Sequence, residues 1–255
     1  MIKEAKVDFS FQLYCARNFA PILDILPRLK ALGYAQVEGF GGLYAQEPGL
    51  AEAVKAAGLT MPTGHFGLDM LKDTSGTMKL AEDLGTKILF CPAIPLLQRT
   101  QGEAGWVELA ETLGELAETY KAAGFGFGWH NHDFEYRATA SGKLPLDIMF
   151  ETAPNLVWQH DIAWTARGGQ DPIAWTRKYA DRVVAIHVKD IAPAGECRDE
   201  DGWADVGHGT LDWPGIMKVV TSETKAQYFV MEHDNPSDVD RFARRSIEAA
   251  RNFGV

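Results

Sequence analysis

Two patterns are missing from this sequence of 255 residues: long apolar runs and an excess of basic residues. No run is long enough to cross a bilayer, and residues 1–9 lack the apolar core of a signal peptide. The formal net charge is -10, whereas a nucleic-acid-binding surface needs a basic face. We therefore expect a cytoplasmic protein without a membrane or nucleic-acid partner.

Cysteine is also scarce, with three widely separated residues in the whole chain. Their odd number and their spacing match no zinc motif and are typical of reduced thiols in a cytosolic protein. A glycine-rich phosphate turn is missing as well, because Gly39, Gly41 and Gly42 do not form the G-x-G-x-x-G pattern. This absence argues against an open, dinucleotide-binding sheet.

What the sequence does contain is an alternation of short apolar runs with amphipathic segments. Eight runs have the length and composition of buried strands. They are Val7–Tyr14, Ala35–Glu38, Thr60–Phe66, Lys87–Cys91, Gly126–Asn131, Val157–Asp161, Val183–Val188 and Tyr228–Glu232. Such alternation implies parallel strands with right-handed crossovers. Eight units in 255 residues favour a closed parallel sheet, so we predict a single α/β domain over residues 1–255, an eight-stranded (β/α)8 TIM barrel.

Apolar residues recur with a helical period in five segments between or after these strands. The segments are Ile22–Leu29, Ala51–Ala57, Met78–Leu84, Trp106–Tyr120 and Val239–Phe253. A glycine follows each of the first four within a few residues, which is a typical helix end. The last helix is expected to begin through Asn235-Pro236-Ser237.

Two connections are much longer than the others, from Asp133 to Pro145 and from Lys189 to Leu211. Both follow predicted strands, so both would lie at the C-terminal face of the barrel, where barrel enzymes place their sites. A long loop without secondary structure of its own is often a lid. We expect a lid at this face.

Histidine and carboxylate residues gather at the predicted strand ends. Six of the seven histidines lie at or near such an end, and a barrel brings strand ends together in space. Glu38, Asp161 and Glu232 end apolar runs, where burying a carboxylate is costly unless it is paired or bound to a cation. Mixed carboxylate and imidazole ligands suit Mn, Fe, Co, Zn or Mg. The sequence therefore indicates a divalent metal site, with pairing to a cation such as Lys189 as the alternative.

The densest polar cluster runs from Trp129 to Tyr136. If the fifth strand ends near Asn131, His130 and His132 point the same way because strand side chains alternate with a period of two. His132 would then be free to act as an acid or base with a pKa near the working pH. An exposed polar loop is the alternative interpretation.

Five segments together resemble the sugar phosphate isomerase/epimerase family, which belongs to the xylose isomerase-like TIM-barrel superfamily. They are His130–Glu135, His160–Trp164, His187–Asp190, Val206–Trp213 and Glu232–Asp234. The resemblance covers essentially the whole chain, and the order of the motifs is more specific than any one of them. The fourth segment contains Gly207-His208-Gly209 where similar chains usually have Gly-Glu-Gly.

The resemblance implies one divalent metal ion, expected to be Mn with Mg, Co, Fe or Zn as alternatives. It implies a ligand after the fifth strand together with Asp161, His187 and Glu232. For the fifth strand we predict Glu135, with His130 as the alternative because it stands where many relatives have a Glu. The residues expected to bind substrate are Glu38, His65, His130, Trp164 and Lys189.

The function that the resemblance implies is isomerisation or epimerisation of a small sugar or polyol, by proton transfer beside a carbonyl through an enediolate. His132 is the first candidate base, with Glu135 and Glu232 as alternatives. If a β-leaving group departs from the same enolate, the outcome is elimination, as in an inosose dehydratase or a 3-keto-glycoside eliminase. Two remoter alternatives are an AP-endonuclease-like phosphodiesterase, which the acidic charge disfavours, and a non-catalytic sugar-binding barrel. A homo-oligomer is compatible with the sequence.

Overall fold

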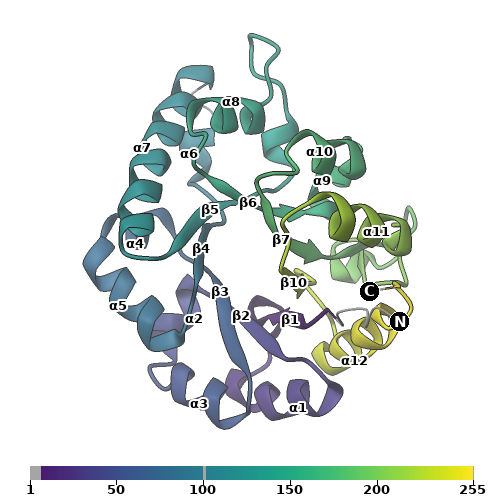
Figure 1. The fold of residues 1–255 in the computed structure, drawn as a ribbon. Helices are drawn as coiled ribbons and strands as arrows, with labels where there is room; N and C mark the ends of the chain where they lie inside the picture. Colours follow the sequence, from purple (N-terminus) through teal and green to yellow (C-terminus); the bar gives the residue numbers. More distant parts are fainter. Residues whose placement is uncertain (1–6, 100–101, 255) are drawn as a thin grey trace.

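In the computed structural model, which describes residues 7–99 and 102–254, eight parallel strands close into a barrel surrounded by helices (Figure 1). The barrel strands are β1 (Phe9–Gln12), β2 (Gln36–Phe40), β3 (Thr60–His65), β4 (Ile88–Cys91), β5 (Gly126–His130), β6 (Val157–Asp161), β7 (Val183–Val188) and β10 (Tyr228–Met231). Their order around the barrel follows the chain, and β10 closes against β1 with Phe11 beside Met231. The predicted (β/α)8 barrel is confirmed. Residues 1–6, part of the segment predicted to lack a signal peptide, lie outside the described residues.

Helices connect the strands and cover the outside of the barrel (Figure 1). They are α1 (Ile25–Leu32), α2 (Gly41–Gln46), α3 (Leu50–Ala56), α4 (Leu68–Lys72), α5 (Thr74–Leu84), α6 (Leu96–Arg99), α7 (Gly102–Ala122), α8 (Pro145–Thr152), α9 (Ile162–Arg167), α10 (Pro172–Lys178), α11 (Trp213–Glu223) and α12 (Val239–Ala250). Gly33 ends α1 with a φ of 106°, a left-handed conformation that favours glycine. Among the described helices, none has the length and apolar character needed to cross a membrane.

Successive residues of each strand alternate between the barrel interior and the layer beneath the helices. On β7, Ile186 and Val188 belong to the apolar core, and His187 between them faces the interior. On β5, Trp129 is buried in the apolar core and His130 faces the interior. This alternation decides which polar residues reach the centre of the barrel.

Two element boundaries differ from the sequence prediction because side chains bind the backbone locally. β1 ends at Gln12 rather than Tyr14, since Gln12 Oε1 accepts a hydrogen bond from Tyr14 N at 3.1 Å and the chain turns into the 3-10 helix η1 (Leu13–Ala16). The last helix begins after Asp238, whose side chain accepts from Arg241 N at 2.9 Å. The predicted entry at residues 235–237 lies just before this cap.

The long connection over residues 189–211 has structure of its own, which corrects the expectation of an unstructured lid. Its strands β8 (Asp190–Ile191) and β9 (Trp203–Ala204) pair antiparallel, and the 3-10 helix η4 (Arg198–Glu200) lies between them. The carboxylate of Asp190 accepts backbone hydrogen bonds from Ile191, Gly207, Gly209 and Leu211. The other long connection, over residues 133–145, contains the 3-10 helix η3 (Phe134–Tyr136).

Candidate metal centre

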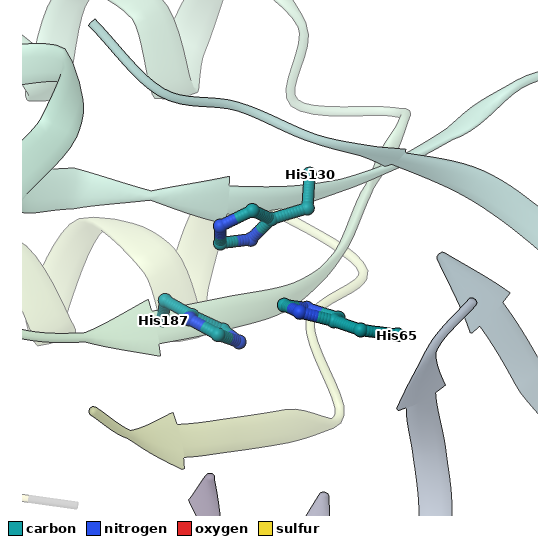
Figure 2. A group of neighbouring side chains, drawn as sticks. All are labelled: His65, His130 and His187. Atoms are coloured by element: carbon teal, nitrogen blue, oxygen red, sulfur yellow. The ribbon is translucent and has the colours of Figure 1, made fainter. Parts of the chain in front are cut away.

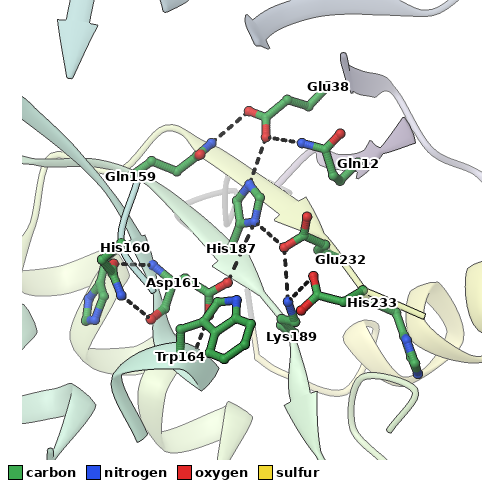
Figure 3. Close-up of polar contacts among 12 residues, drawn as sticks. Gln12, Glu38, Gln159, His160, Asp161, Trp164, His187, Lys189, Glu232 and His233 are labelled. Carbon is green, nitrogen blue, oxygen red and sulfur yellow. Dashed lines mark hydrogen bonds and ion pairs between the residues drawn. The ribbon is translucent and has the colours of Figure 1, made fainter. Parts of the chain in front are cut away.

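Four side chains at the C-terminal ends of β5, β6, β7 and β10 each place one ligand atom within 4.8 Å of the others: His130, Asp161, His187 and Glu232. His187 Nδ1 lies 2.9 Å from Glu232 Oε2 and 3.9 Å from Asp161 Oδ2 (Figure 3). All four side chains belong to residues that are at most 4% exposed. The structure thus brings together the three residues that the sequence singled out on the sixth, seventh and eighth barrel strands.

The free atoms of this group fit a bound cation. Asp161 Oδ2 and His130 Nδ1 are buried and find no hydrogen-bond partner within the described part of the chain. The other Asp161 oxygen accepts from Trp164 N at 2.8 Å, and burial raises the pKa of Asp161 to about 7. A buried polar atom without a partner costs about 1–3 kcal/mol. Two imidazoles and two carboxylates are donors that a divalent transition metal accepts.

Glu135, the predicted ligand from the fifth strand, lies away from this group. Trp129 and His130 are successive on β5 and point to opposite faces, and Trp129 Nε1 donates to Glu135 Oε1 at 2.9 Å. Glu135 Oε2 accepts from His132 N, also at 2.9 Å, and burial raises the pKa of Glu135 to about 8. The four-residue group contains His130 and lacks Glu135. The geometry therefore favours the alternative ligand, and Glu135 instead supports the turn that carries His132.

His132 lies at the mouth of the barrel and is half-buried. Its ring stacks on Phe134, with centroids 5.5 Å apart, and lies 5.4 Å from the Trp164 ring. The rings of His130 and His132 are 5.0 Å apart, as the alternation along the strand predicted. Burial and the nearby Lys189 lower the pKa of His132 to about 3, which differs from the expected value near the working pH. The ring is therefore neutral.

Glu38 and His65, expected to bind substrate, lie in the barrel interior. Glu38 is fully buried; its Oε1 accepts from His187 Nε2 at 2.7 Å and from Gln12 Nε2 at 2.8 Å, and its Oε2 accepts from Gln159 Nε2 at 2.7 Å (Figure 3). His65 Nε2 is 2.6 Å from Gln159 Oε1. Although burial opposes ionisation, His65 and His187 lower the pKa of Glu38. Glu38 has no exposed surface, and its carboxylate contacts His187.

Three histidines from β3, β5 and β7 form a second set with ligand atoms within 4.8 Å of one another: His65, His130 and His187. Figure 2 shows the three rings converging from separate strands. The His65 and His187 rings are nearly parallel, with a 12° interplanar angle and centroids 5.1 Å apart. Nε2 of His65 already binds Gln159, and Nε2 of His187 already binds Glu38. This set therefore has fewer free ligand atoms than the four-residue group.

Lys189 is fully buried between two indole rings, with Nζ 4.9 Å from the Trp164 centroid and 4.2 Å from the Trp203 centroid. It pairs with Asp234 at 2.5 Å and with Glu232 at 3.4 Å. The contacts of Lys189 with Asp234 and Trp203 were not predicted from the sequence. The position of Asp234, two residues after the predicted ligand Glu232, was an available signal, whereas no sequence pattern distinguishes the loop residue Trp203. Lys189, expected to bind substrate, thus has all of its surface covered by other residues of the chain. Trp164, also expected to bind substrate, is half-buried and keeps some exposed surface.

The remaining histidines lie outside the centre. His160 points to the helical side of β6, where Nε2 and Nδ1 bind the hydroxyls of Thr165 and Thr176. The ring of His233 accepts a hydrogen bond from Asn235 N at 3.2 Å. His208 is exposed in the long loop. Gln12 and Gln159 were also missed, although strand alternation could have placed both in the barrel interior.

A parallel eight-stranded barrel with imidazole and carboxylate groups gathered at the C-terminal ends of its strands defines a TIM-barrel protein with a candidate metal centre. The family model for the xylose isomerase-like TIM barrel matches residues 26–253. The chain therefore belongs to this family, which confirms the superfamily that the sequence motifs resembled. The superfamily includes isomerases and dehydratases.

Two curated relatives are similar at low identity. Inosose dehydratase of Geobacillus kaustophilus is 25% identical over 193 residues, which cover 66% of this chain and 61% of that protein. The aligned part thus spans less than two thirds of the dehydratase. The rhizopine catabolism protein MocC of Rhizobium meliloti is 24% identical over 246 residues, covering 83% of this chain and 74% of that protein.

Two crystal structures share the fold along nearly the whole chain. A sugar phosphate isomerase/epimerase from Parabacteroides distasonis has a TM-score of 0.79 and 19% identity, covering 100% of this chain and 98% of that one. The probable 3-DHS dehydratase AsbF from Bacillus anthracis has a TM-score of 0.73 and 14% identity, covering 96% and 99%. At these identities the likeness establishes the fold alone.

Proposed function

We propose that this chain is a metal-dependent enzyme that transfers a proton beside a carbonyl group of a small sugar or polyol. The observation that carries the proposal is the group of His130, Asp161, His187 and Glu232, with two buried atoms that lack partners in the described chain. These four residues would hold one divalent ion. Mn, Fe, Co and Zn suit the two imidazoles better than Mg, which prefers oxygen ligands. A bound ion would supply Lewis-acid stabilisation of negative charge on substrate oxygens.

The residues at the mouth support the proton transfer itself. His132 is half-buried, its ring lies 5.0 Å from that of His130, and its Nδ1 has no hydrogen-bond partner in the described part of the chain. This nitrogen is therefore free to accept a proton from a substrate carbon, although the lowered pKa makes the ring a weak base. Trp164 presents an indole on which the C–H face of a sugar can stack. Burial opposes the negative charge of Glu232, but Lys189 and His187 outweigh it and hold the pKa of Glu232 well below its usual range. Glu232 therefore stays an ionised ligand and is the alternative base.

Two outcomes follow from removal of that proton. Its return to carbon gives isomerisation or epimerisation, which we propose first because the site places the His132 imidazole beside the candidate ligand His130. Departure of a β-hydroxyl gives dehydration, and the similarity to an inosose dehydratase favours this second candidate.

Exchange in deuterated water distinguishes the two outcomes. The metal-loaded protein is incubated with panels of ketoses, inososes and 3-keto-glycosides, and NMR follows the carbon beside the carbonyl. Deuterium incorporation without loss of a group supports isomerase or epimerase activity, whereas loss of water or an aglycone assigns the lyase. Tight sugar binding without any exchange or elimination contradicts both and supports a binding barrel.

The variant His132→Gln tests the assigned base in the same assay. We expect it to slow deuterium exchange by about 10²–10⁴-fold, the usual contribution of a positioned acid or base. Metal content should stay at the wild-type level because His132 is outside the four-residue group. Wild-type exchange rates in this variant would transfer the role to Glu232.

A further inference from the structure

Glu38 lies on β2, whereas the four candidate ligands lie at the ends of β5, β6, β7 and β10. Its side chain is fully buried in the barrel interior. A buried carboxylate is costly unless several donors satisfy it, and here donors come from three other strands (Figure 3). The carboxylate therefore occupies a site that the barrel is built to hold.

The two nitrogens of His187 face different groups. Nε2 lies 2.7 Å from Glu38 Oε1, whereas Nδ1 lies 2.9 Å from Glu232 Oε2 and 3.9 Å from Asp161 Oδ2. An ionised carboxylate only accepts hydrogen bonds, so Nε2 carries the hydrogen in the contact with Glu38. The same rule applies to Nδ1 and Glu232, so each ring nitrogen donates to one carboxylate. A metal bound on the side of Asp161 and Glu232 would replace the Nδ1 hydrogen and leave Nε2–H on Glu38.

The neighbours of Glu38 fix its orientation. Gln12 Nε2 donates to Oε1 at 2.8 Å and Gln159 Nε2 donates to Oε2 at 2.7 Å. The amide of Gln159 is oriented in turn, because its Oε1 takes the hydrogen of His65 Nε2 at 2.6 Å. Each of these neighbours presents a donor to Glu38. A glutamine in place of Glu38 would place its own N–H group opposite one of these donors in either orientation of its amide.

We infer that Glu38 is a positioning residue of the metal centre: it holds His187 as the Nε2–H tautomer and so directs Nδ1 toward Asp161 and Glu232. The inference rests on the proposed metal site and adds to it a residue on the opposite side of the barrel. Carboxylates that bind the second nitrogen of a metal-ligating histidine orient the ring and raise its basicity, and their loss costs about 10–100-fold in metal affinity.

The test is the dissociation constant for Zn²⁺ and for Mn²⁺, measured by competition with a chelator, in wild type, Glu38→Gln, Glu200→Gln and Glu232→Gln. Glu200 is a matched control because it is also a buried carboxylate with several donors, but it binds Arg241 and Ser237 outside the centre. We expect Glu38→Gln to weaken binding by about 10–100-fold and Glu200→Gln to bind as wild type does. Wild-type affinity in Glu38→Gln overturns the inference.

A second readout does not depend on how well Glu38→Gln folds. Nitrogen-15 NMR of wild type loaded with Zn²⁺ should show the His187 hydrogen on Nε2 and the metal at Nδ1; the reverse assignment overturns the inference. If the proposed metal site itself is wrong, the measurements give a different result. Wild type then binds neither ion, or Glu232→Gln binds as tightly as wild type. Either result contradicts the proposed function as well, whereas a normal Glu38→Gln affinity contradicts the inference alone.

Discussion

His187 lies between the carboxylates of Glu38 and Glu232, and Lys189 lies between those of Glu232 and Asp234. Although burial opposes a charged ring, Glu232 and Glu38 raise the pKa of His187 to about 10. Burial likewise opposes the positive charge of Lys189, but Asp234 and Glu232 outweigh it and raise the pKa of Lys189. Buried charges persist when they are paired and hydrogen-bonded, so the candidate ligands are held in place by their own charge network.

Replacing Lys189 with Met tests this network. The change removes the buried cation beside Asp234 and Glu232 and keeps an unbranched side chain that is one atom shorter. Because removing one partner of a buried pair leaves the other unpaired, we expect the free energy of unfolding to fall by about 3–5 kcal/mol. Urea unfolding measures the change.

The matched control is Lys143→Met, which removes an exposed pair in which Nζ lies 3.2 Å from Glu103. Its expected cost is about 0–1 kcal/mol, as for other surface pairs. Equal effects of the two substitutions would show that the buried network contributes no more than a surface ion pair.

The sequence could predict Asp161, His187 and Glu232 because each ends an apolar strand, a signal that is local in the chain. It could not decide between Glu135 and His130, since that depends on where the strand ends and which face each side chain takes. The role of Glu38 was equally hidden, because its partners come from strands that are distant in the sequence.

At the scale of elements, the connection over residues 189–211 is fixed to α12 rather than free to open. Arg241 binds Glu200 at 2.7 Å and Asp205 at 3.1 Å, and Arg245 binds Asp205 at 2.7 Å. The connection thereby holds Trp203 against Lys189. The length and composition of this connection predicted a lid. Its attachment to α12 could not be predicted, because side-chain bonds to a distant helix leave no local pattern in the sequence.

The pH dependence of stability tests this attachment. Although burial alone would raise it, hydrogen bonds from Ser237 and Arg241 lower the pKa of Glu200 from 4.5 to about 2. A lowered folded pKa means that Glu200 stabilises the fold above pH 4.5 and that this contribution is lost as the pH falls toward about 2. Glu200→Gln should therefore be less stable than wild type at pH 7, with a difference that shrinks as the pH falls through this range. Thermal unfolding of both proteins measures it, and a difference independent of pH contradicts the assignment.

At the scale of the whole molecule, the barrel could be predicted almost completely. All eight barrel strands fall inside or within two residues of the predicted segments, because alternating strands and helices leave a periodic apolar pattern. The errors lie at boundaries such as Tyr14, where one side-chain hydrogen bond ends the strand. Membership of the xylose isomerase-like family agrees with this fold, while the reaction depends on the few residues at the strand ends.

The proposed function depends on one divalent ion held by His130, Asp161, His187 and Glu232. The most direct measurement is elemental analysis of wild type, His130→Ala, Asp161→Asn and Glu135→Gln, each purified without chelator. We expect about one divalent ion per chain in wild type and Glu135→Gln, and little metal in His130→Ala and Asp161→Asn. Wild type without metal, or a His130→Ala variant that keeps its metal while Glu135→Gln loses it, would contradict this assignment of the ligands.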